Sequence, residues 1–454
     1  MEFEAPAFVD APVSQDLAKP ITATAALTAG QVLFAESAVV ASVRDVELED
    51  EVHEEGCDDD ECGGCAAVED DDDDAGNGGL DDDDIVAVSA YVKEHFAALM
   101  ETCDPFDVLT MVDIRKNLFK CFHLADADAT ALANFQTMDV VAADAAACLD
   151  AAKALREAHA GAIPSSLTDD HVAHLIGVLN KYSIPLEDIG GSGLFLYVSK
   201  LKHSCTPNAN FTDSGDAIWV TATEAIAAGE EITVDFFDTH YLNVAERQQM
   251  LAEEGQECSC AVCTGVAADK TRAFKCKVNG CVGIVHPTKD VFACATCGNV
   301  WDAAAIAAAQ EEEATLAGVW AVETFEQLDA AIAGSVLHAV HHTFYHAMEA
   351  VTVMDSSLTE AQELAIYYRL LDALNYVAPF PHPEKVALFE KIAQGNVIGG
   401  DISKATDAYT QAYDMCVKVY GPLCDDTKAF KDLMDNTPTT VDELFGPQDD
   451  EDDE

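Results

Sequence analysis

The residues best suited to chemistry in this chain are its cysteines. The 454 residues include 16 of them, and Cys258, Cys260 and Cys263 fall within one stretch of six residues. Thiolates so close together can surround one tetrahedral metal ion, and three of them leave one coordination position open. We expect Cys205, in the motif His-Ser-Cys-Thr-Pro-Asn, to supply the fourth ligand.

A second group of four cysteines follows at a spacing typical of a zinc ribbon. Cys276 and Cys281 come first, and Cys294 and Cys297 form a Cys-x-x-Cys pair with a glycine directly after it. The alternative is a set of free buried thiols, which so dense a run of cysteines makes the weaker interpretation. We therefore predict two structural Zn²⁺ sites, each with four thiolate ligands and no open position.

A further group lies in an acidic stretch over residues 45–84. His53, Cys57, Cys62 and Cys65 would form another metal site, because Cys62 and Cys65 have knuckle spacing and acidic neighbours raise the affinity for a cation. The alternative is a largely disordered acidic insert with incidental thiols, since runs of aspartate cannot bury apolar surface. The sequence leaves both interpretations open.

The charge of the chain argues against one class of partner. It has 83 acidic and 24 basic residues, a formal net charge of −59. Such a surface repels phosphate backbones, so we expect no direct binding of nucleic acid. Basic partners, including Lys-rich protein tails, would be attracted, although solubility in a salty cell interior also explains a uniformly acidic surface.

The ends and hydropathy of the chain indicate its compartment. Residues 1–10 lack the basic and apolar regions of a signal peptide, and no run approaches the ~18 apolar residues of a membrane span. We therefore expect an intracellular protein of the nucleus or cytoplasm, with no membrane partner. In that reducing setting its cysteines are thiols or metal ligands rather than disulfides.

Hydrophobic patterning indicates which elements position these residues, and it predicts an α+β fold. Residues 17–44 have the pattern of a small β-hairpin that turns at Ala29-Gly30, and 85–189 have a helical pattern. Within 190–257 the expected strands are Leu194–Val198, Ile218–Thr223 and Ile232–Phe237. The cysteine-rich segment spans 258–300, a helical segment 301–446 and an acidic tail 447–454.

Four histidines stand in the helical C-terminal segment, namely His338, His341, His342 and His346. Positions four apart share a helix face, which would suit a metal. No carboxylate ligand is evident near them in the sequence. We expect them to be helix-surface or core histidines.

Read in order, these segments resemble the SET domain family, and especially its SET-and-MYND branch. The matching pieces are Asn180-Lys-Tyr-Ser-Ile184, Gly191-Ser-Gly-Leu-Phe195, Lys202-His-Ser-Cys-Thr-Pro-Asn208, Ala222 to Thr233, Glu246-Arg247 and the Cys258 to Cys263 cluster. The resemblance covers roughly residues 17–300. It implies a β-rich SET core with a helical insert, a zinc-binding post-SET segment and an all-helical, tetratricopeptide-like C-terminal domain that binds other proteins.

The resemblance also implies an activity. The family transfers a methyl group from S-adenosylmethionine to a lysine amine of a protein, histones included. It assigns Asn180, Lys202 and His203 to the cofactor pocket, through Asn and His side chains and nearby backbone groups. The structural zinc held by Cys205, Cys258, Cys260 and Cys263 would pin the post-SET segment over the lysine channel.

Three departures from the family pattern keep a second function open. Lys202 replaces an asparagine, and Ala18-Lys-Pro20 stands where the family has Gly-x-Gly. Phe236 occupies the position of the tyrosine that orients the target amine, with Tyr241 the nearest substitute. The alternative to a protein-lysine methyltransferase is a catalytically weakened SET-fold scaffold that binds basic protein partners.

Overall fold

The computed structural model describes residues 11–16, 19–44, 86–128, 130–317 and 322–445. The proposed group of His53, Cys57, Cys62 and Cys65 lies outside these residues. No helix in the described part of the chain is long and apolar enough to cross a membrane. The chain divides into two compact units, each treated by itself: Met1–Ala35, Lys200–Thr212 and Trp219–Glu454 form the first, and Glu36–Ser199 with Asp213–Ile218 forms the second.

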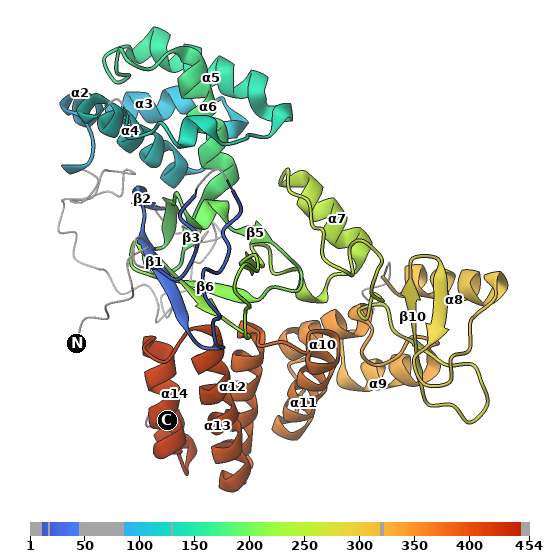
Figure 1. The fold of residues 1–454 in the computed structure, drawn as a ribbon. Helices are drawn as coiled ribbons and strands as arrows, with labels where there is room; N and C mark the ends of the chain where they lie inside the picture. The colour runs from blue at the N-terminus through green and yellow to red at the C-terminus, as the bar shows by residue number, and fades with distance from the viewer. Residues whose placement is uncertain (1–10, 17–18, 45–85, 129, 318–321, 446–454) are drawn as a thin grey trace, which may run out of the picture. The chain divides into compact units, whose positions relative to one another are not determined.

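Helices dominate the second unit, in the cyan and green part of Figure 1. They are α2 (Ala90–Glu94), α3 (Phe96–Cys103), α4 (Val112–Ala127), α5 (Ala145–His159) and α6 (Asp169–Tyr182). Their apolar faces share one core, in which Phe119, Leu155 and Leu175 are fully buried. Thr168 begins α6 by accepting the His171 N–H, and the His171 ring completes a capping box.

A three-stranded antiparallel sheet of order β2-β4-β3 completes this unit, formed by β2 (Val40–Val43), β4 (Gly191–Leu194) and β3 (Ser183–Leu186). Gly191 is required in β4, because a Cβ there would lie 2.0 Å from the carbonyl oxygen of Ser42. The prediction of a strand at Leu194–Val198 is wrong. The strand ends at Leu194, and Val198–Lys200 forms the short helix η5.

The first unit contains the greater part of each of the next strands. β5 (Lys202–His203) pairs in parallel with β8 (Thr233–Val234), and a second sheet has the order β1-β7-β6, formed by β1 (Val32–Ser37), β7 (Ala217–Ala222) and β6 (Ala209–Ser214). The predicted strand Ile218–Thr223 therefore matches β7 to within one residue. The predicted hairpin over residues 17–44 is wrong. The chain does turn at Gly30, but β1 pairs with β7 and β2 with β4, because strands take the partners that bury their apolar faces.

After β8 the chain forms the short helix η6 (Thr239–Tyr241) and then α7 (Val244–Glu253), which Asn243 caps. A small antiparallel sheet of order β11-β10-β9 follows, made by β9 (Phe274–Lys275), β10 (Ile284–Thr288) and β11 (Val291–Cys294). Phe274 and Phe292 pack with Trp301 beneath this sheet. The sheet and the helices after it therefore share one core.

The remaining chain is helical and runs from yellow to red in Figure 1. Its helices are α8 (Ala303–Ala317), α9 (Phe325–Gly334), α10 (His342–Met354), α11 (Glu360–Val377), α12 (Pro383–Ile398), α13 (Ile402–Val419), α14 (Asp425–Asp435) and α15 (Val441–Phe445). α12 packs between α11 and α13, and α13 packs against α14. Tyr345, Leu374 and Tyr409 are among the fully buried residues of this core.

Candidate functional site

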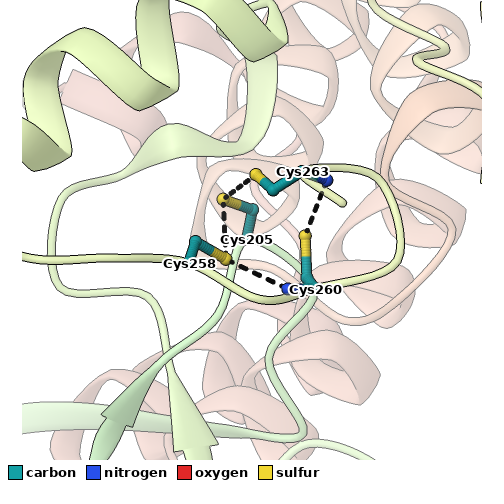
Figure 2. Close-up of side chains that lie close together, drawn as sticks. All are labelled: Cys205, Cys258, Cys260 and Cys263. Atoms are coloured by element: carbon teal, nitrogen blue, oxygen red, sulfur yellow. Dashed lines mark hydrogen bonds between the residues drawn. The ribbon is translucent and has the colours of Figure 1, made fainter. Parts of the chain in front are cut away.

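Four cysteines meet in the first unit, and Figure 2 shows their sulfur atoms facing one another. We call Cys205, Cys258, Cys260 and Cys263 the first tetrad. The Sγ of Cys205 lies 3.7 Å from that of Cys258 and 3.7 Å from that of Cys263. Sulfur atoms around a tetrahedral zinc ion lie about 3.8 Å apart, given a zinc–sulfur distance of about 2.3 Å. Both distances therefore fit a zinc site, and all four sulfurs lie within 4.8 Å of one another.

Two separate segments bring the first tetrad together. Cys205 lies two residues after the end of β5, and the other three cysteines lie in the loop after α7. Leu251 of α7 is buried and packs against Cys205 and Cys258. Backbone N–H groups point at the sulfurs: that of Cys260 donates to Cys258, and that of Cys263 donates to Cys260, each at 3.4 Å (Figure 2). Such bonds stabilise thiolates over thiols, which is what a metal requires.

The second tetrad consists of Cys276, Cys281, Cys294 and Cys297, held by the β9–β11 sheet. Cys276 and Cys297 have sulfurs 3.7 Å apart, and those of Cys281 and Cys294 are 3.8 Å apart. Burial alone would raise the pKa of Cys294, but the backbone N–H groups of Cys297 and Thr296 lower it to about 7. This tetrad also fits a four-thiolate zinc site.

Two other groups combine histidines with a carboxylate: Glu313, His341 and His342, and Asp238, His240 and His382. Hydrogen bonding explains each group better than a metal does. The Nδ1 of His341 accepts the Thr343 N–H and caps α10, and the Nδ1 of His382 accepts the Glu384 N–H and caps α12. A neutral imidazole that accepts at Nδ1 carries its proton on Nε2. Each Nε2 faces its carboxylate, at 3.2 Å for His341 and 3.6 Å for His382, and a protonated nitrogen cannot bind a metal.

The residues predicted for a cofactor pocket fall in both units. Asn180 belongs to the second unit, where its amide donates to the carbonyls of Val108 at 2.8 Å and Ile176 at 3.0 Å. Lys202 belongs to the first unit and forms an ion pair with Glu231 at 3.3 Å. His203 is buried beside it, with its Nε2 3.5 Å from the sulfur of Cys205.

Phe236 and Tyr241 lie in the loop and short helix after β8. The Phe236 ring packs against Phe211 with centroids 5.4 Å apart. Tyr241 is 2% exposed, stacks on Tyr345 at 3.6 Å, and donates its hydroxyl to the carbonyl of Val340 at 2.9 Å. Burial raises the pKa of Tyr241 well above its ordinary value, so it stays a neutral donor to this carbonyl.

Two carboxylates that the sequence did not single out shape the backbone here. Asp235 accepts the N–H groups of Phe237 at 3.0 Å and Thr239 at 2.8 Å, and the Thr239 hydroxyl at 2.8 Å, which fixes the turn after β8. An Asp followed closely by a Thr is a local signal for such a turn. In the second unit, Glu36 accepts the three backbone N–H groups of residues 196–198. Burial raises the pKa of Glu36, and these hydrogen bonds oppose that rise. Among 83 acidic residues nothing in the sequence marked Glu36.

The paired ends of β5 and β8, with a cysteine tetrad that ties the following segment to β5, agree with the SET-domain resemblance of the sequence. Comparison with known proteins agrees: residues 20–237 match the family model described as SET domain. The chain therefore carries a SET domain and resembles proteins of the SET-and-MYND kind.

Its curated relatives carry names of that kind. It is 32% identical over 126 residues to the SET domain-containing protein SmydA-8, isoform B, of Drosophila melanogaster, covering 26% of this chain and 28% of that protein. It is 34% identical over 98 residues to the histone-lysine N-methyltransferase set5 of Schizosaccharomyces pombe, covering 21% and 30%. It is 34% identical over 110 residues to the protein-lysine N-trimethyltransferase SMYD5 of Gallus gallus, covering 22% and 25%. The chain thus spans less than a third of the length of each of these relatives.

Proposed function

We propose that the chain is a protein-lysine N-methyltransferase that uses S-adenosylmethionine. The observation that carries this proposal is the SET domain over residues 20–237, shared with relatives named as lysine methyltransferases. S-adenosylmethionine would supply the methyl group, by in-line displacement at its sulfonium carbon. The protein would hold the methyl donor and the target amine collinear and would exclude water from the site.

The cofactor would contact Asn180, Lys202 and His203. Asn180 donates both of its described amide hydrogen bonds to carbonyls, which leaves its Oδ1 to accept from an ammonium group such as that of the methionine part. Lys202 would repel a sulfonium if its charge were unpaired. Its ion pair with Glu231 balances that charge and supports cofactor binding at this position.

Both tetrads would hold Zn²⁺ in structural sites, because four thiolates leave no position for water or substrate. The first tetrad would fix the segment after α7 against β5. The second would stabilise the β9–β11 sheet, which is too small to support a core of its own.

The helices after Trp301 would bind proteins. Their successive antiparallel packing, as in α11, α12 and α13, supports a tetratricopeptide-like domain, and the net charge of −59 favours basic, Lys-containing partners over nucleic acid. A histone tail is one such substrate. We place the protein inside the cell, in the nucleus or cytoplasm, away from membranes.

A SET-fold scaffold that binds basic proteins without methylating them is the second candidate. The observation that favours it concerns hydroxyl groups: Phe236 has none, and that of Tyr241 is bonded to the Val340 carbonyl. Under the methyltransferase proposal, Phe236 and Tyr241 would shape the wall against which the target amine is oriented.

The test begins with calorimetry of S-adenosylmethionine binding to the zinc-loaded protein, followed by methyl transfer to lysine peptides. Micromolar binding with measurable transfer supports the enzyme. Phe236→Tyr should raise the rate by supplying the missing hydroxyl, while the matched control Phe237→Tyr should not. Undetectable binding of S-adenosylmethionine would overturn the enzyme and leave the scaffold.

A further inference from the structure

The His203 imidazole lies between the first tetrad and the end of β8. Its side chain is 1% exposed. On one side the Nε2 lies 3.5 Å from the sulfur of Cys205, and on the other the Nδ1 lies 3.4 Å from the backbone nitrogen of Phe236. Both ring nitrogens therefore have a partner within the protein.

These two contacts fix where the ring carries its proton. The Phe236 N–H can only donate, so the Nδ1 that it faces must accept, and the proton of a neutral ring is then on Nε2. That proton points at the Cys205 sulfur, which as a zinc ligand has no proton and must accept. Each requirement alone selects the same tautomer, and the two are independent.

Asp235 is the one described carboxylate that competes for the ring, with Oδ1 3.5 Å from the Nδ1. Both of its oxygens already accept donors, Oδ1 from the Phe237 N–H and Oδ2 from Thr239, at distances of 3.0 and 2.8 Å. These bonds direct both oxygens toward the turn, and the Nδ1 lies slightly closer to the Phe236 nitrogen than to Asp235, at 3.4 against 3.5 Å, so we assign the Nδ1 as the acceptor of the Phe236 N–H.

Cys205 has particular need of such a donor. It is 2% exposed, against 9% for Cys258, and a buried thiolate is costly without N–H groups directed at it. Backbone N–H groups serve Cys258 and Cys260, from Cys260 and Cys263 respectively. For Cys205 the corresponding nitrogen donor among the described residues is the ring of His203.

We propose that His203 is a positioning residue that links the zinc ion of the first tetrad to the backbone of Phe236 through one rigid ring. It stabilises the Cys205 thiolate and fixes the end of β8 at a set distance from the metal. The inference rests on the proposed zinc site but not on methyl transfer. It also changes a role assigned from the sequence: the ring of His203 is already used, so this residue would serve a cofactor through its backbone.

Two substitutions separate the two hydrogen bonds. The amide of His203→Asn ends near the position of Nδ1, so it can still accept the Phe236 N–H but cannot reach the sulfur. The amide nitrogen of His203→Gln ends near the position of Nε2 and can still donate to the Cys205 sulfur. The second tetrad consists of four cysteines and does not include His203, so it serves as an internal control in the same molecule.

The measurement is the rate of zinc release to a chelating dye from protein loaded with two zinc ions. In His203→Asn one of the two ions should leave about 10 to 100 times faster, as is typical when a hydrogen bond to a metal ligand is lost, and the other at the wild-type rate. His203→Gln should stay close to wild type. Unchanged release in the Asn variant, or equal acceleration of both ions, overturns the proposal.

A second measurement is made on the wild-type protein, and a variant serves only to assign a signal. Nitrogen NMR of the cadmium-loaded wild-type chain reports the tautomer of each histidine, and His203→Gln identifies the signal by its loss. We expect an Nε2–H tautomer whose proton correlates with cadmium through the sulfur. An Nδ1–H tautomer overturns the proposal. Failure of the chain to bind two metal ions would instead contradict the zinc sites of the proposed function.

Discussion

Acidification should weaken the C-terminal helices through the histidine that caps α10. Burial lowers the pKa of His341 from 6.5 to about 4, and the hydrogen bond to Glu313 only partly opposes this effect. Protonation would place a hydrogen on Nδ1, remove the acceptor of the Thr343 N–H and put a positive charge at the positive end of the helix. The unfolded chain has none of these penalties.

The size of the effect follows from the two pKa values. Between pH 7 and pH 5 the unfolded chain binds more protons at His341 than the folded protein does, so stability falls as the pH falls. With a pKa of 6.5 in the unfolded chain and about 4 in the folded protein, the loss from this residue is roughly 2 kcal/mol at pH 5. It reaches roughly 3 kcal/mol below both pKa values.

The assay is urea unfolding of the wild type and of His341→Asn at pH 7 and pH 5, in buffer with zinc. Asparagine accepts the same backbone N–H at a helix start but does not titrate. The other histidines and the carboxylates titrate in both proteins, so their contributions largely cancel in the difference. The wild type should lose roughly 2 kcal/mol more than the variant between the two pH values. Equal losses would refute the reasoning.

Three further predictions concern the metal, the sheet and the cofactor. Cys205→Ser should reduce bound zinc from two ions to one by elemental analysis, while Cys121→Ser, at a fully buried thiol of the second unit, should leave it at two. Gly191→Ala should lower the melting temperature strongly, because the new Cβ would overlap the Ser42 carbonyl. Gly334→Ala should not, because the space around Gly334 is open, and equal losses in the two variants would contradict the contact between Gly191 and Ser42. Lys202→Asn should tighten S-adenosylmethionine binding in calorimetry by no more than a few-fold, since Glu231 already balances the charge; a large gain would show that the ion pair does not shield it.

The cysteine tetrads were predictable because metal ligands impose spacing on the sequence. Cys-x-x-Cys at Cys294 and the triplet from Cys258 show which residues belong together before any fold is known. The fourth ligand, Cys205, came from the same rule, since three thiolates leave one position open. The sulfur distances of 3.7 Å agree with that assignment.

Strand pairing and ring orientation were not predictable in the same way. The apolar runs of β1 and β2 carry no mark of distant partners such as Leu194, which pairs with Val40, so a local hairpin was the natural but wrong expectation. Likewise, the motif around His203 indicates a site without showing which way the ring points. Only the position of the Phe236 backbone shows that the His203 ring already accepts a hydrogen bond at its Nδ1.

The sheet of the second unit determines where this chain can gain or lose residues with little loss of stability. β2 ends at Val43, which pairs with Gly191 of β4, and β3 pairs Leu186 with the same Gly191. The chain thus leaves the sheet beside Gly191 and re-enters it at Ser183, which pairs with Leu194 at the other end of β4. The two edge strands are therefore parallel and are joined by a long crossover that contains α2 to α6, and doubling the length of a flexible connection costs only about 0.6 kcal/mol. Insertions within this crossover should therefore cost little stability, because the register of both edge strands is set by their pairing with β4.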